Sequence, residues 1–277
     1  MSTLIGPAED LLRAIGAAPQ APIDLAEAAL ALAVLEAAPS GLDRYRKHLA
    51  LMAENLAEVA QGARSVAEQV SSLGLVMVER LGYRGDTEGY DALENANLLH
   101  VIDRRRGLPV ALGILFIHAA RSQGWRAGGL AFPGHFLIRI EGMDGRAIVD
   151  PFHEGRSQDA AALRRLLKAT AGDQAELADQ HCALVSDRDV LLRLQNNIKL
   201  RLIAQERFAE AGRTLDRMLL MAPEDSGLWQ ECAVIQAEIG AIDRAQSAID
   251  AALGLPISDA SRAVMQTLRQ RLRRSLH

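Results

Sequence analysis

The segment from Pro109 to Gln123, PVALGILFIHAARSQ, constrains the fold more than any other because it is apolar on nearly every side. Pro109 suits the first position of a helix, where the missing amide N–H costs nothing, and Gly124 suits the helix end. A helix that is apolar all round must be buried. We therefore expect this helix at the centre of a core.

Three short segments after this helix predict an antiparallel sheet. They are AGGLAF at 127–132, HFLIRI at 135–140 and RAIVD at 146–150. Asp144 and Gly145 provide hairpin chemistry between the second and third segments. The sequence thus predicts a helix packed against an antiparallel sheet, and a parallel arrangement of these strands would contradict it.

Helices also dominate the N-terminal part. Ala, Leu and Glu are frequent in the first 80 residues, and helices are expected at 25–38 with Asp24 and Glu27 forming a box-like cap, at 42–61 and at 65–81. Residues 82–97 are rich in turn formers and predict a long ordered loop. A short helix should follow, with Arg104 to Arg106 in its last turn and Gly107 just beyond.

The C-terminal part contains an internal repeat. Phe208 and Ile242, and likewise Ala211 and Ala245, are 34 residues apart, and prolines at 223 and 256 end the two copies. This period is typical of tetratricopeptide helix pairs. Two copies are few for such a stack, so helices around 191–202 and 263–276 should cover its ends.

Together these patterns predict a predominantly helical α+β fold with two domains. The first covers 1–183, with a helical part at 1–90, a helix-and-sheet core at 91–170 and a linker at 171–183. The second, 184–277, holds the tetratricopeptide-like helical repeats.

Composition excludes several functional classes. A net charge of −4 and a pI near 6.0 provide no general attraction to nucleic acid or to an anionic membrane surface. No stretch approaches about 18 uncharged apolar residues, so no membrane span is expected. The cysteines, Cys182 in the expected linker beyond the sheet and Cys232 in a repeat helix, suit a reducing compartment, and we expect a cytoplasmic protein.

His135 and Asp150 are the candidate chemical pair. They lie in neighbouring predicted strands, where a carboxylate can orient an imidazole as in the base half of a hydrolytic triad. The alternative is a pair that only ties two strands together. With His153 they offer metal-ligand chemistry, but the spacing matches no zinc pattern, so neither a metal nor another cofactor is expected.

The segment NANLLHVIDRRRGLPVALGILFIHAARSQGWRAGGLAFPGHFLIRI, followed by IVDPFHEG, resembles the SirB-type bacterial branch of the transglutaminase-like superfamily. The resemblance extends from about residue 24 to 256. It implies a core with a Cys-His-Asp triad, in which His135 and Asp150 match the catalytic His and Asp. The position of the cysteine falls on Pro109, and no Ser, Thr or Cys lies between Thr87 and Ser122.

The resemblance therefore predicts a scaffold or regulatory protein without catalysis. It would bind a protein or peptide partner through its cleft or its repeats. Asn97, Arg105 and Arg106 are candidate binding residues, although each also suits a purely structural role in a loop or helix end. The alternative function is a hydrolase or transferase in which His135 and Asp150 act as an acid-base pair without a nucleophilic cysteine. The partner and the oligomeric state stay open.

Overall fold

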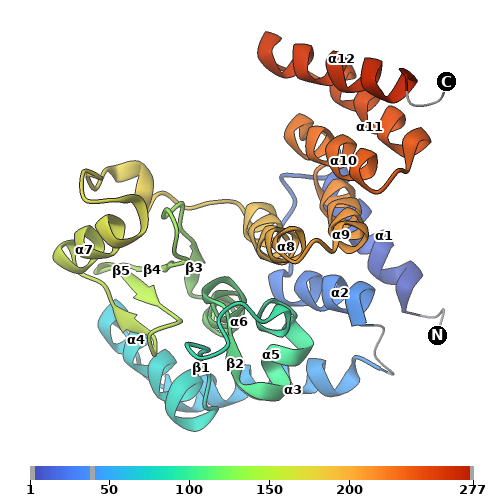
Figure 1. The fold of residues 1–277 in the computed structure, drawn as a ribbon. Coiled ribbons are helices and arrows are strands. Elements are labelled where there is room, and N and C mark those ends of the chain that lie inside the picture. Colours follow the sequence, from blue (N-terminus) through green and yellow to red (C-terminus); the bar gives the residue numbers. More distant parts are fainter. Residues whose placement is uncertain (1–3, 38–40, 275–277) are drawn as a thin grey trace. The chain divides into compact units, whose positions relative to one another are not determined.

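The computed structural model describes residues 4–37 and 41–274 (Figure 1). The chain is an α+β protein dominated by helices, as predicted. It forms two compact units, the first centred on Pro22–Leu194 and the second made of Gly6–Ala21 together with the chain from Gln195 onwards. This division falls later than the predicted boundary at 183, inside the continuous helix α8 (Asp187–Ala204).

The first unit begins with the predicted helices. They are α2 (Leu25–Ala37), α3 (Asp43–Val59) and α4 (Val66–Gly74), the last continuing as a π-helical turn over Leu75–Arg80. The carboxylate of Asp24 accepts a hydrogen bond from the amide of Glu27 at 3.0 Å, as an N-cap should. Only this half of the predicted capping box forms, because the side chain of Glu27 binds Arg46 instead of the N-cap backbone.

The central helix α6 (Pro109–Ser122) confirms the strongest sequence prediction. Pro109 occupies its first turn, and Gly124 follows its end with a φ of 73°. The helix is buried from Pro109 to Ile117. It packs against α2, α3 and α5 (Leu98–Arg104) as well as against the sheet strands β3 (Arg126–Gly129) and β4 (Ile138–Gly142), so it forms the middle of the core.

The sheet is antiparallel with strand order β3-β4-β5-β6, where β5 is Gly145–Asp150 and β6 is Arg156–Ser157. Two details of the prediction were wrong. His135 does not open β4 but lies before it in a bend, where Gly134 has a φ of 70° and turns the chain. The hairpin turn consists of Met143 and Asp144, and Gly145 already begins β5.

The segment from 82 to 107 corrects the predicted end of the short helix. Helix α5 ends at Arg104, because Arg105 adopts the left-handed conformation with a φ of 58°. Arg106–Gly107 then form strand β2, which pairs in parallel with β1 (Arg84–Gly85). This small parallel pair lies outside the three predicted strands. The predicted loop is thus pinned to the core by backbone hydrogen bonds.

Helix α7 (Ala160–Ala171) was not predicted. Asp159 caps it, and Leu163 and Leu167 are buried in one apolar cluster with Leu130, Phe132 and Leu137. The chain then returns to the sheet through a 3-10 turn at Asp179–Cys182. Cys182 therefore does not lie beyond the sheet, since its carbonyl accepts a hydrogen bond of 2.9 Å from Arg139 in β4.

The second unit is wholly helical in its described part. Besides the end of α8 it contains α1 (Ile5–Ala17), α9 (Phe208–Met221), α10 (Ser226–Glu238), α11 (Ile242–Gly254) and α12 (Asp259–Arg274). Successive helices from α9 to α12 pack on one another, which is the arrangement expected of helical repeats.

Helix α1 belongs to this second unit although it lies within the predicted first domain. The reason is a close approach between two backbones. A side chain at Gly16 would overlap the carbonyl oxygen of Leu220 at the end of α9 and would touch Pro223. Only glycine permits this distance, which makes α1 part of the helical stack.

Candidate functional site

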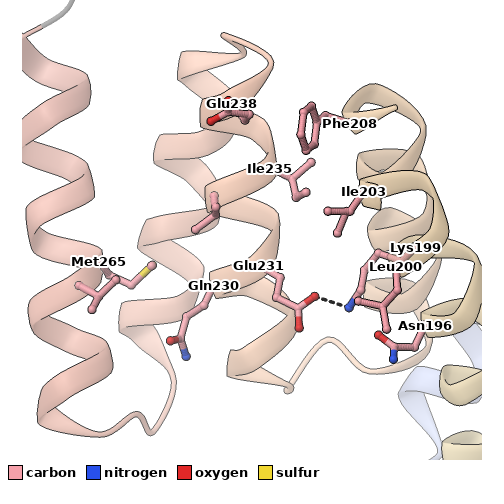
Figure 2. A pocket seen from close by; sticks show the side chains of 12 residues that line it. Asn196, Lys199, Leu200, Ile203, Phe208, Gln230, Glu231, Ile235, Glu238 and Met265 are labelled. Carbon is pink, nitrogen blue, oxygen red and sulfur yellow. Dashed lines mark hydrogen bonds and ion pairs between the residues drawn. The ribbon is translucent and has the colours of Figure 1, made fainter. Parts of the chain in front are cut away.

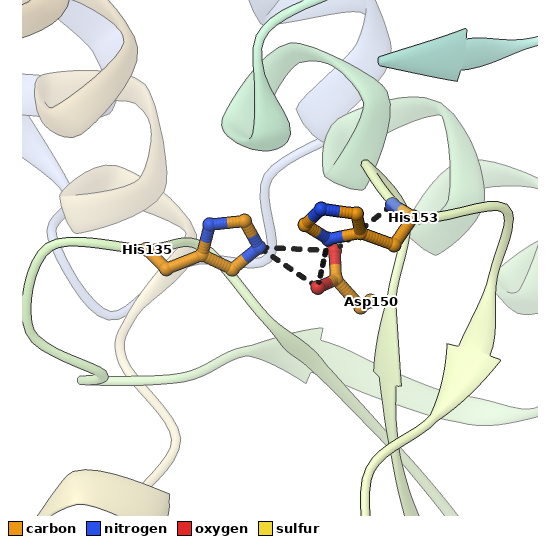
Figure 3. Close-up of side chains that lie close together, drawn as sticks. All are labelled: His135, Asp150 and His153. Carbon is orange, nitrogen blue, oxygen red and sulfur yellow. Dashed lines mark hydrogen bonds and ion pairs between the residues drawn. The ribbon is translucent and has the colours of Figure 1, made fainter. Parts of the chain in front are cut away.

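His135 and Asp150 meet at one end of the sheet (Figure 3). The Nε2 atom of His135 lies 3.0 Å from each carboxylate oxygen of Asp150. Asp150 is the last residue of β5, and the bend at Gly134 turns His135 towards it. Asp150 is only 2% exposed and His135 only 9% exposed. The structure therefore brings together the two residues that the sequence singled out.

The carboxylate of Asp150 is held by four donors. Its Oδ1 accepts from the amides of Phe152 and His153 at 3.0 and 3.3 Å, and its Oδ2 lies 2.8 Å from Nδ1 of His153. Burial raises the pKa of Asp150, but the hydrogen bonds and positive charge of His135 and His153 outweigh this effect and lower that pKa below its ordinary value. Asp150 is thus an ionised, rigidly placed acceptor.

Arg193 fixes the main chain around His135. Its guanidinium donates to the carbonyl oxygens of His135 and Phe132 at 2.7 and 3.1 Å and lies over the ring of Phe136. Because two of these residues flank the bend at Pro133 and Gly134, one side chain from α8 sets the conformation of the whole turn. Sequence reasoning missed Arg193, since nothing in the pattern of α8 points to a loop 58 residues earlier.

Gly113 brings this turn onto the central helix. A Cβ atom at Gly113 would overlap the ring of Phe136, the residue after His135. The bend therefore packs on α6 one turn after Pro109, at the end of the helix where a transglutaminase-like triad would place its nucleophile. Pro109 itself is buried and has no side-chain group that could attack a substrate.

The orientation of the imidazole defines what the pair can do. With Nε2 on Asp150, the remaining ring nitrogen Nδ1 is left for another partner (Figure 3). A carboxylate in this position fixes the tautomer and the orientation of the ring. The ring of His153 stacks at 5.6 Å on that of His135, and Phe152 lies edge-on to both. The arrangement can exchange a proton or bind a cation.

The ordered loop reaches the same cluster through Tyr90, whose ring meets Phe152 edge-on at 5.7 Å. Asp86 and Arg104 hold the loop in place with an ion pair of 2.8 Å, and Arg104 also donates to Asn95 at 3.0 Å. Loops of this length often carry function. Tyr90 and Phe152 gave no sequence signal beyond their positions in the loop and directly after Asp150-Pro151.

The remaining predicted site residues have other partners. Asn97 caps α5 by accepting from the amide of Leu99 at 3.1 Å and donates to Glu36 at 2.9 Å. Arg105 donates to the hydroxyl of Tyr83, and Arg106 donates to the carbonyl of Arg105. These hydrogen bonds stabilise the α5–β2 corner, and none of them leads to His135 or Asp150.

Residues 43–196 match the family model described as the transglutaminase-like superfamily. This match includes α6, the sheet and the His135–Asp150 pair. The chain belongs to the transglutaminase-like superfamily. Its membership accounts for the central helix followed by an antiparallel sheet that carries a His and an Asp, and it confirms the resemblance seen in the sequence.

Relatives of this transglutaminase-like protein are bacterial. A UPF0162 protein of Xylella fastidiosa (strain Temecula1) is 31% identical over 188 residues, which are 64% of this chain and 66% of the relative. A UPF0162 protein of Vibrio cholerae is 32% identical over 52% of this chain and 53% of its own length. Protein SirB1 of Salmonella typhimurium is 24% identical over 71% of this chain and 72% of its own.

The SirB1 relative agrees with the SirB-type branch that the sequence suggested. The match to the Xylella relatives covers slightly less than two thirds of their length. No solved structure matches the chain. Within residues 4–37 and 41–274, no helix has the length and apolar content that crossing a membrane requires.

Proposed function

We propose that this transglutaminase-like protein is a non-catalytic scaffold that binds an extended peptide segment of a partner protein on its second unit. The observation that carries the proposal is a groove of about 740 Å³ between helices of that unit (Figure 2). Its wall is largely apolar, and the apolar residues that line it are Leu200, Ile203, Phe208, Val234, Ile235, Val264 and Met265.

The groove exposes apolar side chains at repeated positions. Leu200 on α8 and Val234 on α10 are 34 residues apart and are 54% and 50% exposed, and Val264 on α12 is 57% exposed. Contiguous exposed aliphatic groups in a hollow are typical of an interaction surface. They suit apolar side chains of a bound segment.

Amide side chains recur beside these aliphatic positions. Asn196 and Gln230 both line the groove and are again 34 residues apart. A side-chain amide can donate and accept at once, as the main chain of an extended peptide requires. The ion pair between Lys199 and Glu231 lies in the same wall and connects α8 to α10 (Figure 2). This combination of apolar and amide groups supports a peptide as the occupant.

The start of α6 supports the absence of catalysis. A Cys-His-Asp mechanism needs a thiolate there, and Pro109 provides none. Loss of the nucleophile from a hydrolytic triad costs about a millionfold in rate in a measured protease. The His135–Asp150 pair then serves to shape the turn on which Arg193 and Phe136 pack.

Selection from a peptide library displayed on phage, with the purified full-length chain as bait, tests the proposal. Peptides enriched by the wild type should lose at least about tenfold in affinity against Leu200→Asp combined with Val234→Asp, because each change places a charge in an apolar groove. Met143→Asp changes a fully exposed methionine of the first unit and should bind like the wild type. Equal binding to the groove variant, or failure to enrich any peptide, contradicts the proposal.

A second candidate function is acid-base catalysis by His135 without a covalent step. The bond from Nε2 to Asp150 favours it, because Nδ1 is left as a base. Amide and ester hydrolysis by purified chain distinguishes the two functions. Turnover that His135→Ala removes and the groove variant retains would establish the second candidate. Absence of turnover, with peptide binding unchanged in His135→Ala, is the result we expect.

A further inference from the structure

We propose that His135, Asp150 and His153 bind a divalent transition-metal ion such as Zn²⁺ or Fe²⁺. Nε2 of His135, Nδ1 of His153 and a carboxylate oxygen of Asp150 all lie within 4.8 Å of one another (Figure 3). Two imidazoles and one carboxylate form a donor set that such ions prefer, whereas Mg²⁺ and Ca²⁺ prefer oxygen alone. This proposal is independent of the groove and of its occupant.

The distances between the ligand atoms suit one shared ion. Oδ2 of Asp150 lies 3.0 Å from Nε2 of His135 and 2.8 Å from Nδ1 of His153. Two ligands of a tetrahedral ion, each about 2.05 Å from the metal, are about 3.3 Å apart. The carboxylate and the two rings therefore need only small shifts to enclose an ion on one side and to leave its other side open.

The carboxylate is already oriented as a metal ligand should be. Its Oδ1 is occupied by the amides of Phe152 and His153, so Oδ2 is the oxygen turned towards both rings. Hydrogen bonds from the backbone to a ligating carboxylate are the usual outer-shell support of a metal site. The Asp150 carboxylate is 2% exposed and provides the negative charge that a buried cation needs.

An ion can enter the site from the side of His153. The side chain of His153 is 54% exposed, whereas that of His135 is 10% exposed. Spacing in the sequence did not predict this site. The turn after Asp150 brings His153 back onto the carboxylate three residues earlier, while His135 arrives from the bend that precedes β4.

The competing explanation is a cluster in which protons, not a metal, lie between the rings and the carboxylate. Titration of Co²⁺ into the untagged, full-length chain after treatment with EDTA separates the two. We expect visible absorption bands that saturate at one equivalent, and release of protons as the ion replaces them. His153→Ala should weaken binding at least about tenfold, since it removes a ligand rather than an outer-shell partner.

His100→Ala is the matched control, because His100 is an exposed histidine of the same unit and should bind Co²⁺ like the wild type. Zn²⁺ should also raise the Tm of the wild type and of His100→Ala but not that of His153→Ala. Because the side chain of His153 is exposed, His153→Ala should keep the fold intact. The metal site can therefore be tested without replacing the buried ligands His135 and Asp150. If Co²⁺ does not bind, or if His153→Ala binds it as tightly as the wild type, the metal site is ruled out.

Discussion

Arg105 donates a hydrogen bond of 2.7 Å to the hydroxyl of Tyr83, and its guanidinium lies over the same ring. Arg105 has a backbone conformation that non-glycine residues rarely adopt, so these contacts offset a local strain. His48 completes the cluster, with Nε2 2.8 Å from the hydroxyl of Tyr83 and 3.0 Å from Arg105. The left-handed corner between α5 and β2 thus depends on a polar cluster from three distant segments.

Protonation of His48 should weaken the fold in mild acid. Burial and the charge of Arg105 lower the pKa of His48 from 6.5 to about 4. The unfolded chain therefore binds the extra proton first, and stability that is complete above pH 6.5 is lost as the pH falls towards 4. We expect a loss of about 1 kcal/mol, allowing for solvent screening of a partly exposed ring.

Urea unfolding at a series of pH values measures this effect. His48→Gln should flatten the dependence in that window, whereas His100→Gln should leave it unchanged. An identical pH dependence in the wild type and in His48→Gln would show that other groups cause it.

Tyr83→Phe should destabilise the first unit by about 1 to 2 kcal/mol. The hydroxyl of Tyr83 is buried and bonds both Arg105 and His48, so its removal leaves Arg105 without that acceptor and His48 without its hydroxyl partner. Chemical denaturation checks the value. His100→Gln, at an exposed position of the same unit, should cost less than about 0.5 kcal/mol. Equal costs would mean that the buried cluster contributes nothing specific.

Asp150→Ala should be among the most damaging single changes in the first unit. It removes the acceptor of two backbone amides and of two imidazoles from a site that is 2% exposed. Breaking a buried, hydrogen-bonded charged group typically costs about 3 to 5 kcal/mol. Thermal unfolding should detect it, and Asp173→Ala, at an exposed position in the same unit, should leave the Tm nearly unchanged. A small loss in Asp150→Ala would indicate that water replaces the carboxylate.

Gly16→Ala should destabilise the second unit by about 1 to 3 kcal/mol although alanine is the better helix former. Its methyl group would overlap the carbonyl oxygen of Leu220. Gly6→Ala in the same helix meets no atom within 4 Å and should be neutral or stabilising. Denaturation followed by tryptophan fluorescence compares the two, since Trp229 lies on α10. Equal stability of the two variants would refute the close approach.

Local signals predicted the centre of the fold well. Pro109 and Gly124 marked both ends of α6, and alternation marked β4 and β5, because these features depend on nearest neighbours and on burial. Helix α7 escaped prediction because its buried leucines, Leu163 and Leu167, form only a short stripe among alanines and charged residues. That stripe stabilises the helix only when the apolar residues of the sheet are present to cover it.

The candidate site was predicted in part. His135 and Asp150 are fifteen residues apart in the sequence, and the hairpin between them brings their side chains into contact. The support from Arg193 and the placement of α1 depend on contacts between segments far apart in the chain, for which periodicity gives no information. The end of α5 was misassigned because an arginine, rather than Gly107, adopts the left-handed cap.

The position of Gly16 against α9 bears on how the protein is made. The ribosome releases α1 before the whole first unit, yet its packing partners emerge only after residue 194. During synthesis Leu12 and Ile15 of α1 therefore stay exposed to solvent while the intervening transglutaminase-like core folds. A nascent chain released before α9 is made would therefore expose the apolar face of α1 to chaperones and proteases, even with the transglutaminase-like core fully folded.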